Sequence, residues 1–282
     1  LIYLMSAYQI GNNLMEHFVT LFDKNYLPSG LCLYLSIKKF HNEFTLWIIC
    51  MDEDVWHQLS DYKLSNIKLI KLSEIETPDL LAVKNERTRV EYCWTLTPFT
   101  PKIIFDREPS IDRVTYIDAD LYFFDSTNKI FDEFEQSNSD VLITEHGYAN
   151  RYDKSAKSGI YCVQFMVFRN TSEALRVLNW WKEKCIEWCF NRCEDGKCGD
   201  QKYLDDWPER FGGAIHVLKN LSLTLAPWNV ERFLNQANEN YRPTFFHFHG
   251  LRINSNNSIR LYFGYKIPNK GMIYYHEYTN MM

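Results

Sequence analysis

Two aspartates one residue apart, Asp118 and Asp120, follow a short run of β-branched and aromatic residues over 113–117. Side chains two positions apart in an extended chain point to the same side. The two carboxylates would then meet at a strand end, where their repulsion has to be offset by a cation. A hard divalent ion such as Mg²⁺ or Mn²⁺, with phosphate oxygens completing its shell, suits such a site. A solvated acidic turn gives the same pattern, and the spacing alone favours that simpler interpretation.

Polar residues also follow the first predicted strand, over residues 14–23. This strand leads into the segment Asp23-Lys24-Asn25-Tyr26. Asp23 can accept a hydrogen bond from a nucleobase N–H, and Tyr26 can stack on the base. Tyr26 can equally pack against the start of the helix that follows.

Two more groups that can do chemistry lie in the second half of the chain. Asp200 and Gln201 can form hydrogen bonds with hydroxyl groups of a ligand, and Asp200 can act as a general base. An aspartate that opens a helix is also a good N-cap. His247 and His249 alternate just before Gly250, so both would face the same side of a strand. An imidazole is a common metal ligand, although a packed or hydrogen-bonded histidine is the simpler alternative for either.

Composition limits the class of protein. The chain has 282 residues, of which 46% are apolar and 24% charged, enough for one large α/β domain. A net charge of −5 without a basic block argues against a nucleic-acid binder. Aromatic residues make up 16%, and Trp228 could line a sugar site, although core packing is its simpler role.

Targeting signals are weak. No run of about 18 apolar residues predicts a membrane span. Leu1-Ile2-Tyr3-Leu4-Met5 lacks the basic and long apolar parts of a signal peptide. We therefore expect a cytoplasmic protein, with peripheral contact at the inner face of the membrane if its acceptor is lipid-linked.

Four of the eight cysteines are close in sequence: Cys185, Cys189, Cys193 and Cys198. The paired C-x-x-C spacing of common structural zinc sites is missing. We expect buried or free thiols, reduced as in a cytosol.

The order of elements predicts an α/β fold, a mostly parallel sheet with helices on both faces. Strands are predicted over 14–23, 44–50, 67–72, 113–117, 140–144 and 160–168, and helices through 33–37 and over 52–59, 86–105, 128–135 and 171–190. Pro98 and Pro101 must break or bend the helix over 86–105, and Pro208 should end a helix that begins at Asp200. Ligands of such sheets bind outside the carboxyl ends of the strands, where the Asp23 and Asp118 loops would both lie.

Together these segments resemble nucleotide-sugar glycosyltransferases of the GT-A fold. They are most similar to glycosyltransferase family 8, the galactosyltransferase and glycogenin group, and to bacterial surface-polysaccharide relatives. The resemblance spans Asp23 to about Gly250, and the order and spacing of its motifs are more specific than any one of them. It is carried by Asp23-Lys24-Asn25-Tyr26, Asp118-Ala119-Asp120, the strand over 161–170, Asp200-Gln201 and His247-Phe248-His249-Gly250.

The resemblance implies a single GT-A domain over residues 1–282. A nucleotide-binding half would cover 15–150, an acceptor and catalytic half 151–255, and a segment of unknown role 256–282. The implied activity is a metal-dependent, hexosyltransferase-type transfer from a nucleotide-diphosphate sugar, UDP-sugar foremost, to a saccharide or lipid-linked acceptor. It implies retention of configuration and a role in glycan or surface-polysaccharide synthesis.

The same resemblance assigns roles to individual residues. Asp200 and Gln201 would lie near the transferred sugar as the catalytic pair. The ligands of Mn²⁺ or Mg²⁺ would be Asp118, Asp120 and His247. The nucleotide sugar would be bound by Asp23, Asn25, Tyr26, Asp118, Gly250 and Arg252.

Three positions depart from the pattern of the group. Trp94 stands where an arginine is usual, Cys162 replaces a common asparagine, and Ile253 replaces a phosphate-binding lysine. Arg252 can substitute for that lysine. The donor sugar and the stereochemical outcome stay open for this reason.

Three rival functions fit less well. A sugar nucleotidyltransferase needs a Gly-rich, Arg-containing loop after the first strand, and residues 21–30 hold one glycine and no arginine. A D-x-D-x-T phosphatase carries its motif after the first strand. Here the acidic pair lies in the middle of the chain, and Tyr122 stands where that motif has its threonine. The intact acidic pair argues against a non-catalytic carbohydrate- or nucleotide-binding relative.

Overall fold

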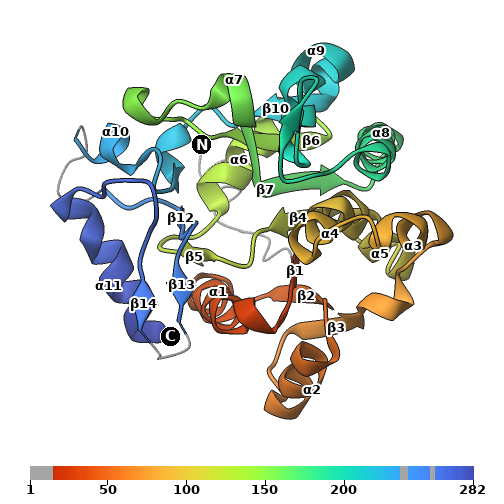
Figure 1. Cartoon of the computed structure of the whole chain (residues 1–282), viewed down its shortest axis with the longest axis horizontal. Helices are drawn as coiled ribbons and strands as arrows, with labels where there is room; N and C mark the ends of the chain where they lie inside the picture. The colour runs from red at the N-terminus through yellow and green to blue at the C-terminus, as the bar shows by residue number, and fades with distance from the viewer. Residues whose placement is uncertain (1–14, 236–240, 255–257) are drawn as a thin grey trace, which may run out of the picture.

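The computed structural model describes residues 15–235, 241–254 and 258–282, and it is built on a seven-stranded sheet (Figure 1). The strand order is β10-β6-β7-β4-β1-β2-β3. All neighbours are parallel except that β7 runs antiparallel to both β4 and β6. The predicted α/β class with a mostly parallel sheet is confirmed. The strands are β1 (Glu16–Phe22), β2 (Phe44–Cys50), β3 (Ile67–Lys71), β4 (Arg113–Ile117), β6 (Val141–Glu145), β7 (Tyr161–Arg169) and β10 (Ile215–Val217).

Helices cover both faces of this sheet because successive strand residues point to opposite sides. Val19 packs into one core with α3 (Pro78–Lys84), α4 (Arg89–Leu96), α5 (Thr100–Arg107), α8 (Ser172–Glu187) and α9 (Trp207–Phe211). Its neighbour Phe18 packs into the other core with α1 (Leu27–Phe40), α2 (Glu53–Tyr62) and α6 (Asn128–Ser137). Thr171 caps α8, since its hydroxyl accepts the Ala174 N–H at 3.2 Å.

A second, three-stranded sheet contains His247 and begins one of its strands directly after the acidic motif. Its order is β11-β12-β5, with β12 (Phe245–His247) antiparallel to β5 (Leu121–Phe123) and parallel to β11 (Thr224–Leu225). Because β5 starts directly after Asp120, the pairing sets His247 opposite Leu121, next to the acidic pair. The remaining elements are small: α7 (Ser155–Ser158), α10 (Val230–Leu234) and the hairpins β8 (Cys193–Glu194) with β9 (Lys197–Cys198) and β13 (Arg252–Ile253) with β14 (Ile259–Arg260).

The C-terminal helix α11 (Met272–Met281), which the sequence left unassigned, packs behind this second sheet (Figure 1). Tyr278 stacks on Phe248, with ring centroids 3.9 Å apart and planes 8° apart. Tyr275 contacts both Phe246 and Phe248, at 5.3 and 5.1 Å between centroids. Since Phe246 and Phe248 flank His247, α11 supports the strand that carries this histidine.

Prolines shape two further segments, one as predicted and one not. The helix over 86–105 is broken into α4, a 3₁₀ turn that contains Pro98, and α5 with Pro101 near its start, as expected. The expectation that Pro208 ends a helix is wrong. A 3₁₀ helix, η5 (Gln201–Asp206), ends first, and Pro208 lies in the first turn of α9, where a missing N–H breaks no helical hydrogen bond.

The prediction of eight reduced thiols is also wrong for one pair. Cys193 and Cys198 form a disulfide across the β8–β9 hairpin, whose turn contains Asp195 and Gly196 at φ 49° and 75°. Sequence alone did not reveal that two residues with positive φ bring the cysteines together. The other six cysteines are free, and within the described ranges no cysteine belongs to a group that could hold a metal ion.

None of the helices within residues 15–235, 241–254 and 258–282 has the length and apolar character that crossing a membrane requires. The N-terminal segment Leu1–Met5 lies outside the described residues.

Removal of the Tyr275 ring should destabilise the domain, because this side chain of α11 is fully buried against Phe246 of β12. We expect Tyr275→Ala to lower the free energy of unfolding by about 3–5 kcal/mol in urea titrations followed by circular dichroism. The matched control is Tyr275→Phe. The buried Tyr275 hydroxyl has no hydrogen-bond partner among the described residues, so this change should cost less than about 1 kcal/mol. Equal losses in both variants would contradict the packing role of the ring.

Candidate active site

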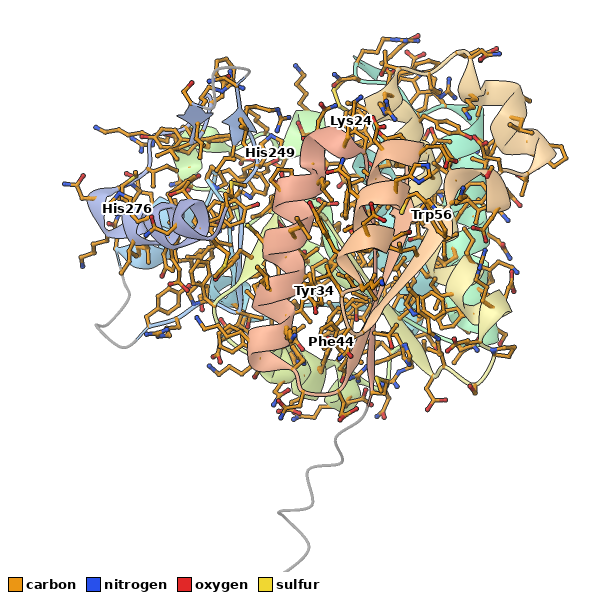
Figure 2. The ribbon with its side chains drawn as sticks, turned by 90° about the horizontal axis from the view of Figure 1, so that it is seen from below. Lys24, Tyr34, Phe44, Trp56, His249 and His276 are labelled. Atoms are coloured by element: carbon orange, nitrogen blue, oxygen red, sulfur yellow. A yellow bond between two sulfur atoms is a disulfide. The ribbon has the colours of Figure 1, made fainter. Side chains whose placement is uncertain are left out.

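The predicted site residues gather at the carboxyl end of the parallel strands. Figure 2 shows Lys24 and His249 at one end of α1, and Phe44, where β2 begins, at the other. Strand β1 ends at Phe22, β2 at Cys50 and β4 at Ile117, so the loops that follow them meet at the Lys24 end. This is the edge at which ligands bind in open α/β sheets.

The backbone fixes the acidic pair between three elements. The Asp118 N–H donates to the Gln164 carbonyl of β7 at 3.0 Å, and the chain turns so that the Leu121 N–H donates to the Asp118 carbonyl at 3.2 Å. The Asp120 carbonyl accepts the N–H of Phe248, directly after β12, at 2.9 Å. Because these groups are bonded, the turn is rigidly placed against both sheets.

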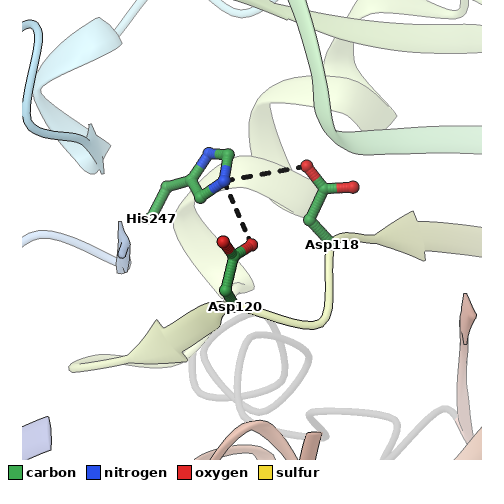
Figure 3. Close-up of side chains that lie close together, drawn as sticks. All are labelled: Asp118, Asp120 and His247. Carbon is green, nitrogen blue, oxygen red and sulfur yellow. Dashed lines mark ion pairs between the residues drawn. The ribbon is translucent and has the colours of Figure 1, made fainter. Parts of the chain in front are cut away.

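His247 closes the acidic pair into a cluster of three side chains (Figure 3). Its Nε2 lies 3.1 Å from Asp120 Oδ1 and 3.8 Å from Asp118 Oδ2. One ligand atom from each residue can be chosen so that all three lie within 4.8 Å of one another. The sequence left His247 and His249 in competition, and the geometry joins His247, not the exposed His249, to the carboxylates.

Two groups outside the predicted set orient this cluster. Gln164 is completely buried, and its Oε1 accepts a hydrogen bond from His247 Nδ1–H at 2.8 Å, which directs Nε2 at the carboxylates. The Tyr116 hydroxyl donates to Asp118 Oδ1 at 2.9 Å. A signal for both was present in the sequence: Gln164 is a lone amide in a nine-residue apolar strand, and Tyr116 lies two residues before Asp118 on a strand.

The charges of the cluster are strongly coupled. Burial raises the pKa of Asp118 to about 7, and the charge of Asp120 adds to this while His247 opposes it. Burial acts in the same direction on Asp120, but the attraction of His247 outweighs it and lowers the pKa of Asp120. Burial alone would lower the pKa of His247, yet Asp120 and Asp118 raise it well above its ordinary value. The two carboxylates therefore favour the imidazolium form of His247, whose ring bridges Asp120 and Gln164.

The donor set of the cluster fits Mn²⁺ or Mg²⁺. Two carboxylates and one imidazole suit a borderline-hard divalent cation, and they leave coordination positions for phosphate oxygens or water. The arrangement of His247, with Nδ1–H donated to an amide and Nε2 directed at the site, is the one usual for a metal-ligating histidine.

The Asp23 segment forms a hydrogen-bonded turn at the end of β1. Asp23 accepts the backbone N–H of Asn25 at 2.9 Å and the Asn25 amide at 3.1 Å. Its carboxylate also pairs with Arg89 of α4 at 3.1 Å, and the same guanidinium reaches Asp52 after β2 at 3.0 Å. Arg89 was not singled out from the sequence, since nothing local to it indicates that α4 crosses the ends of β1 and β2.

Tyr26 and Arg252 connect this turn to the late part of the chain. The Arg252 guanidinium lies 5.2 Å from the centre of the half-buried Tyr26 ring. Burial and the charge of Asp120 raise the pKa of Tyr26 to about 12, while Arg252 opposes this rise. Tyr26 is therefore within electrostatic reach of both Asp120 and Arg252. Gly250 lies two residues before Arg252 at φ +82°, a conformation that favours glycine.

Asp200 and Gln201 begin the η5 segment that packs on β7. The Asp200 carbonyl accepts the Trp181 Nε1–H at 2.9 Å, and its side chain makes no capping hydrogen bond, so the N-cap alternative does not apply. Burial and then the charge of Asp118 raise the pKa of Asp200 well above its ordinary value. The structure therefore brings Asp200 near the acidic cluster, while Gln201 is half-buried at the start of η5.

Two proteins of Bacillus subtilis (strain 168), both described as uncharacterized, match most of the chain. YfnF is 30% identical over 255 residues, which cover 86% of this chain and 84% of YfnF. YfnD is 27% identical over 266 residues, which cover 91% of this chain and 85% of YfnD. No model of a known protein family matches the chain.

Solved glycosyltransferase structures share the fold. Galactosyltransferase LgtC, in complex with donor and acceptor sugar analogs, matches with a TM-score of 0.59 and 12% identity over 94% of each chain. Mouse xyloside xylosyltransferase 1 matches with a TM-score of 0.52 and 14% identity over 87% of this chain and 99% of its own. GlyE of Streptococcus pneumoniae TIGR4 gives 0.53 and 12% over 94% of this chain and 62% of GlyE. At such identities the likeness shows the fold, and the chain has the GT-A fold.

Binding of Mn²⁺ should tighten as pH rises, because the raised pKa values of Asp118 and His247 mean that protons must leave before both can ligate. Between about pH 6 and about pH 8 we expect the affinity to increase by roughly tenfold or more for each proton released. Isothermal titration calorimetry in two buffers of different ionisation enthalpy measures both the affinity and the proton release. A pH-independent affinity without proton release would contradict the charge state described above.

Gln164→Leu should weaken Mn²⁺ binding by about 10–100-fold. Leucine is similar in size to glutamine and suits the apolar strand β7, but it cannot accept the hydrogen bond from His247 Nδ1–H. Gln58→Leu, an equivalent change on the exposed face of α2, serves as the control. The unfolding free energy of both variants separates a loss of orientation from a loss of fold. Wild-type affinity in Gln164→Leu would show that His247 does not need this contact.

Proposed function

The chain belongs to the protein family that includes YfnF of Bacillus subtilis, and we propose that it is a divalent-cation-dependent glycosyltransferase. Its donor would be a nucleotide-diphosphate sugar, a UDP-sugar foremost, and its acceptor a saccharide or a lipid-linked glycan. The observation that carries the proposal is the cluster of Asp118, Asp120 and His247 at the ligand-binding edge of a GT-A sheet. A role in glycan or surface-polysaccharide synthesis is part of this proposal.

Transfer of a sugar from such a donor leaves a nucleoside diphosphate, on which negative charge develops as the glycosidic bond breaks. Mn²⁺ or Mg²⁺, when bound, supplies positive charge at these phosphate oxygens. Asp118 and Asp120 would hold the cation, and His247, oriented by Gln164, would complete its protein ligands. Arg252, whose guanidinium lies over Tyr26 and whose charge helps to lower the pKa of Asp120, would donate hydrogen bonds to a phosphate.

The nucleoside would bind along the Asp23 turn. Asp23 keeps lone pairs beyond its contacts with Asn25 and Arg89, so it can accept an N–H of the base. Tyr26 offers a ring face for stacking, and the face now covered by Arg252 becomes free if that guanidinium turns to the diphosphate.

The state of Asp200 favours retention of configuration. Burial and the charge of Asp118 raise the pKa of Asp200 well above its ordinary value, so this carboxyl keeps a proton more readily than a free aspartate and is less available as the base that an inverting transfer needs. In this proposal Asp200 and Gln201 bind and orient the transferred sugar through hydrogen bonds, and the acceptor proton leaves with the departing diphosphate.

Asp120→Asn should abolish activity, because it removes the carboxylate nearest His247 and half of the anionic charge of the cluster. We expect wild-type protein with Mn²⁺ to release UDP from a UDP-sugar in a panel of UDP-, GDP-, dTDP- and CMP-sugars, and Asp120→Asn to be at least roughly 100-fold slower. Asp132→Asn, on the exposed side of α6, is the matched control and should keep wild-type activity.

The same assay tests the other parts of the proposal. Proton NMR of the product gives its anomeric configuration, and inversion would contradict the role assigned to Asp200. If the wild-type protein with metal neither bound nor turned over any sugar nucleotide, this result would overturn the glycosyltransferase proposal.

A further inference from the structure

A group of aromatic side chains continues outward from the ring of His247, beginning with Trp228. The buried ring of Trp228 lies 5.3 Å from the His247 ring and 5.5 Å from the exposed His249 ring. Its Nε1–H donates to the His146 carbonyl at 2.9 Å, and the Asn229 amide donates to the same carbonyl at 2.9 Å. Trp228 is therefore a fixed inner wall, which fits the core-packing role expected for it.

Three half-buried tyrosines lie outside this wall: Tyr148, Tyr152 and Tyr265. Tyr265 lies 6.2 Å from Trp228 and 5.1 Å from Tyr152, and the planes of the two tyrosines are 75° apart. The rings of Tyr152 and Tyr265 thus meet nearly at a right angle, and we call this pair of rings the tyrosine corner. Tyr148 stacks on His146, with centroids 4.6 Å and planes 10° apart, and lies 6.4 Å from Trp228.

This corner joins two distant parts of the chain, and polar contacts hold it in place. Tyr148 and Tyr152 follow β6, whereas Tyr265 precedes α11. The backbone N–H of Lys266 donates to the Tyr152 hydroxyl at 2.6 Å, and the Lys154 ammonium lies 5.3 Å from the Tyr265 ring centre. The loop itself is tied to α10 by an ion pair of Arg151 with Glu231 at 2.6 Å. The rings are thus ordered before any ligand arrives, which lowers the entropy cost of binding.

We propose that Tyr148, Tyr152 and Tyr265 form the platform for the pyranose ring of the acceptor, which rests on the function proposed above. The C–H face of a pyranose is apolar and packs on an aromatic ring, while its hydroxyls need polar partners at the ring edge. Tyrosine hydroxyls and the Lys154 ammonium supply such partners at this corner.

Location supports the acceptor over the donor as the occupant. The Trp228 wall touches the ring of His247, whose Nε2 faces the carboxylates that would hold the donor diphosphate. The nucleotide side is occupied by different residues, Tyr26 and Arg252. A sugar on the tyrosine corner would thus lie beside the reacting centre without competing for the nucleotide positions. The segment over residues 256–282, whose role the sequence left unknown, would contribute Tyr265 to acceptor binding.

The test uses saturation-transfer-difference NMR with methyl glycopyranosides of glucose, galactose, rhamnose and N-acetylglucosamine, in the presence of UDP and diamagnetic Mg²⁺. Ring C–H protons of at least one glycoside should receive saturation from the wild-type protein. Tyr265→Ala and Tyr152→Ala should each weaken its binding by roughly tenfold. Tyr265→Phe keeps the ring and should bind close to the wild-type level. Tyr62→Ala removes a tyrosine that is 50% exposed on α2 and is the control for the substitution itself.

The affinity of each variant for UDP with Mg²⁺, measured by calorimetry, separates the two proposals. Failure of the wild-type protein to bind UDP with Mg²⁺ would overturn the glycosyltransferase function, and the platform with it. Normal UDP binding without saturation of any glycoside would overturn the platform alone. Unchanged glycoside binding in both alanine variants, or a parallel loss of UDP affinity in them, would overturn it as well.

Discussion

Two carboxylates held within one partly buried turn need a positive charge, and the rest of the structure depends on how that charge is supplied. The side chains of Asp118 and Asp120 are only 29% and 14% exposed, so water screens their repulsion poorly. In this structure the nearest cation is the imidazolium of His247, whose Nε2–H donates to Asp120. The same nitrogen is the one available to a metal. Proton and metal therefore compete for one position, and either one brings positive charge to the acidic pair.

This requirement explains why His247, a candidate metal ligand, depends on the packing of the C-terminal helix α11. His247 lies next to the acidic pair because β12 pairs with β5, and β5 begins at Leu121, the residue after Asp120. Strands of three residues contribute few hydrogen bonds, so their position has to be fixed by packing. The aromatic layer of α11 provides it: Phe246 and Phe248, on either side of His247, both pack on Tyr275.

Local chemistry was readable from the sequence, and long-range placement was not. The spacing of Asp118 and Asp120, the strand before them and the α/β order depend on alternation and periodicity, which act over a few residues. The pairing of β5 with β12 joins residues more than one hundred positions apart, and nothing in either three-residue segment specifies its partner. For the same reason the sequence could not choose between His247 and His249, which have the same local surroundings.

The errors have equally specific causes. Pro208 was expected to end a helix because proline lacks an N–H, but the same property makes it acceptable in a first turn, and only the η5 geometry decides between the two. Cys193 and Cys198 were expected to be free because no standard spacing links them, whereas a turn with two positive φ values closes them into a hairpin. Gln164 was visible as a polar residue in an apolar strand, yet its role appears only when β12 places His247 against it.

The two sides of His247 differ in their physics. On the nucleotide side, Arg89 joins Asp23 and Asp52, and its side chain is 49% exposed, so these ion pairs are open to screening by salt. On the other side, the contacts of Trp228, Tyr152 and Tyr265 are between rings, which salt affects little. A charged ligand is attracted over a distance, whereas a ring platform acts only at contact. The ring of His247 contacts Trp228, and its Nε2 lies 3.1 Å from Asp120. In the proposed glycosyltransferase, attraction over a distance would favour capture of the charged donor, and the rings would select the uncharged sugar by its shape.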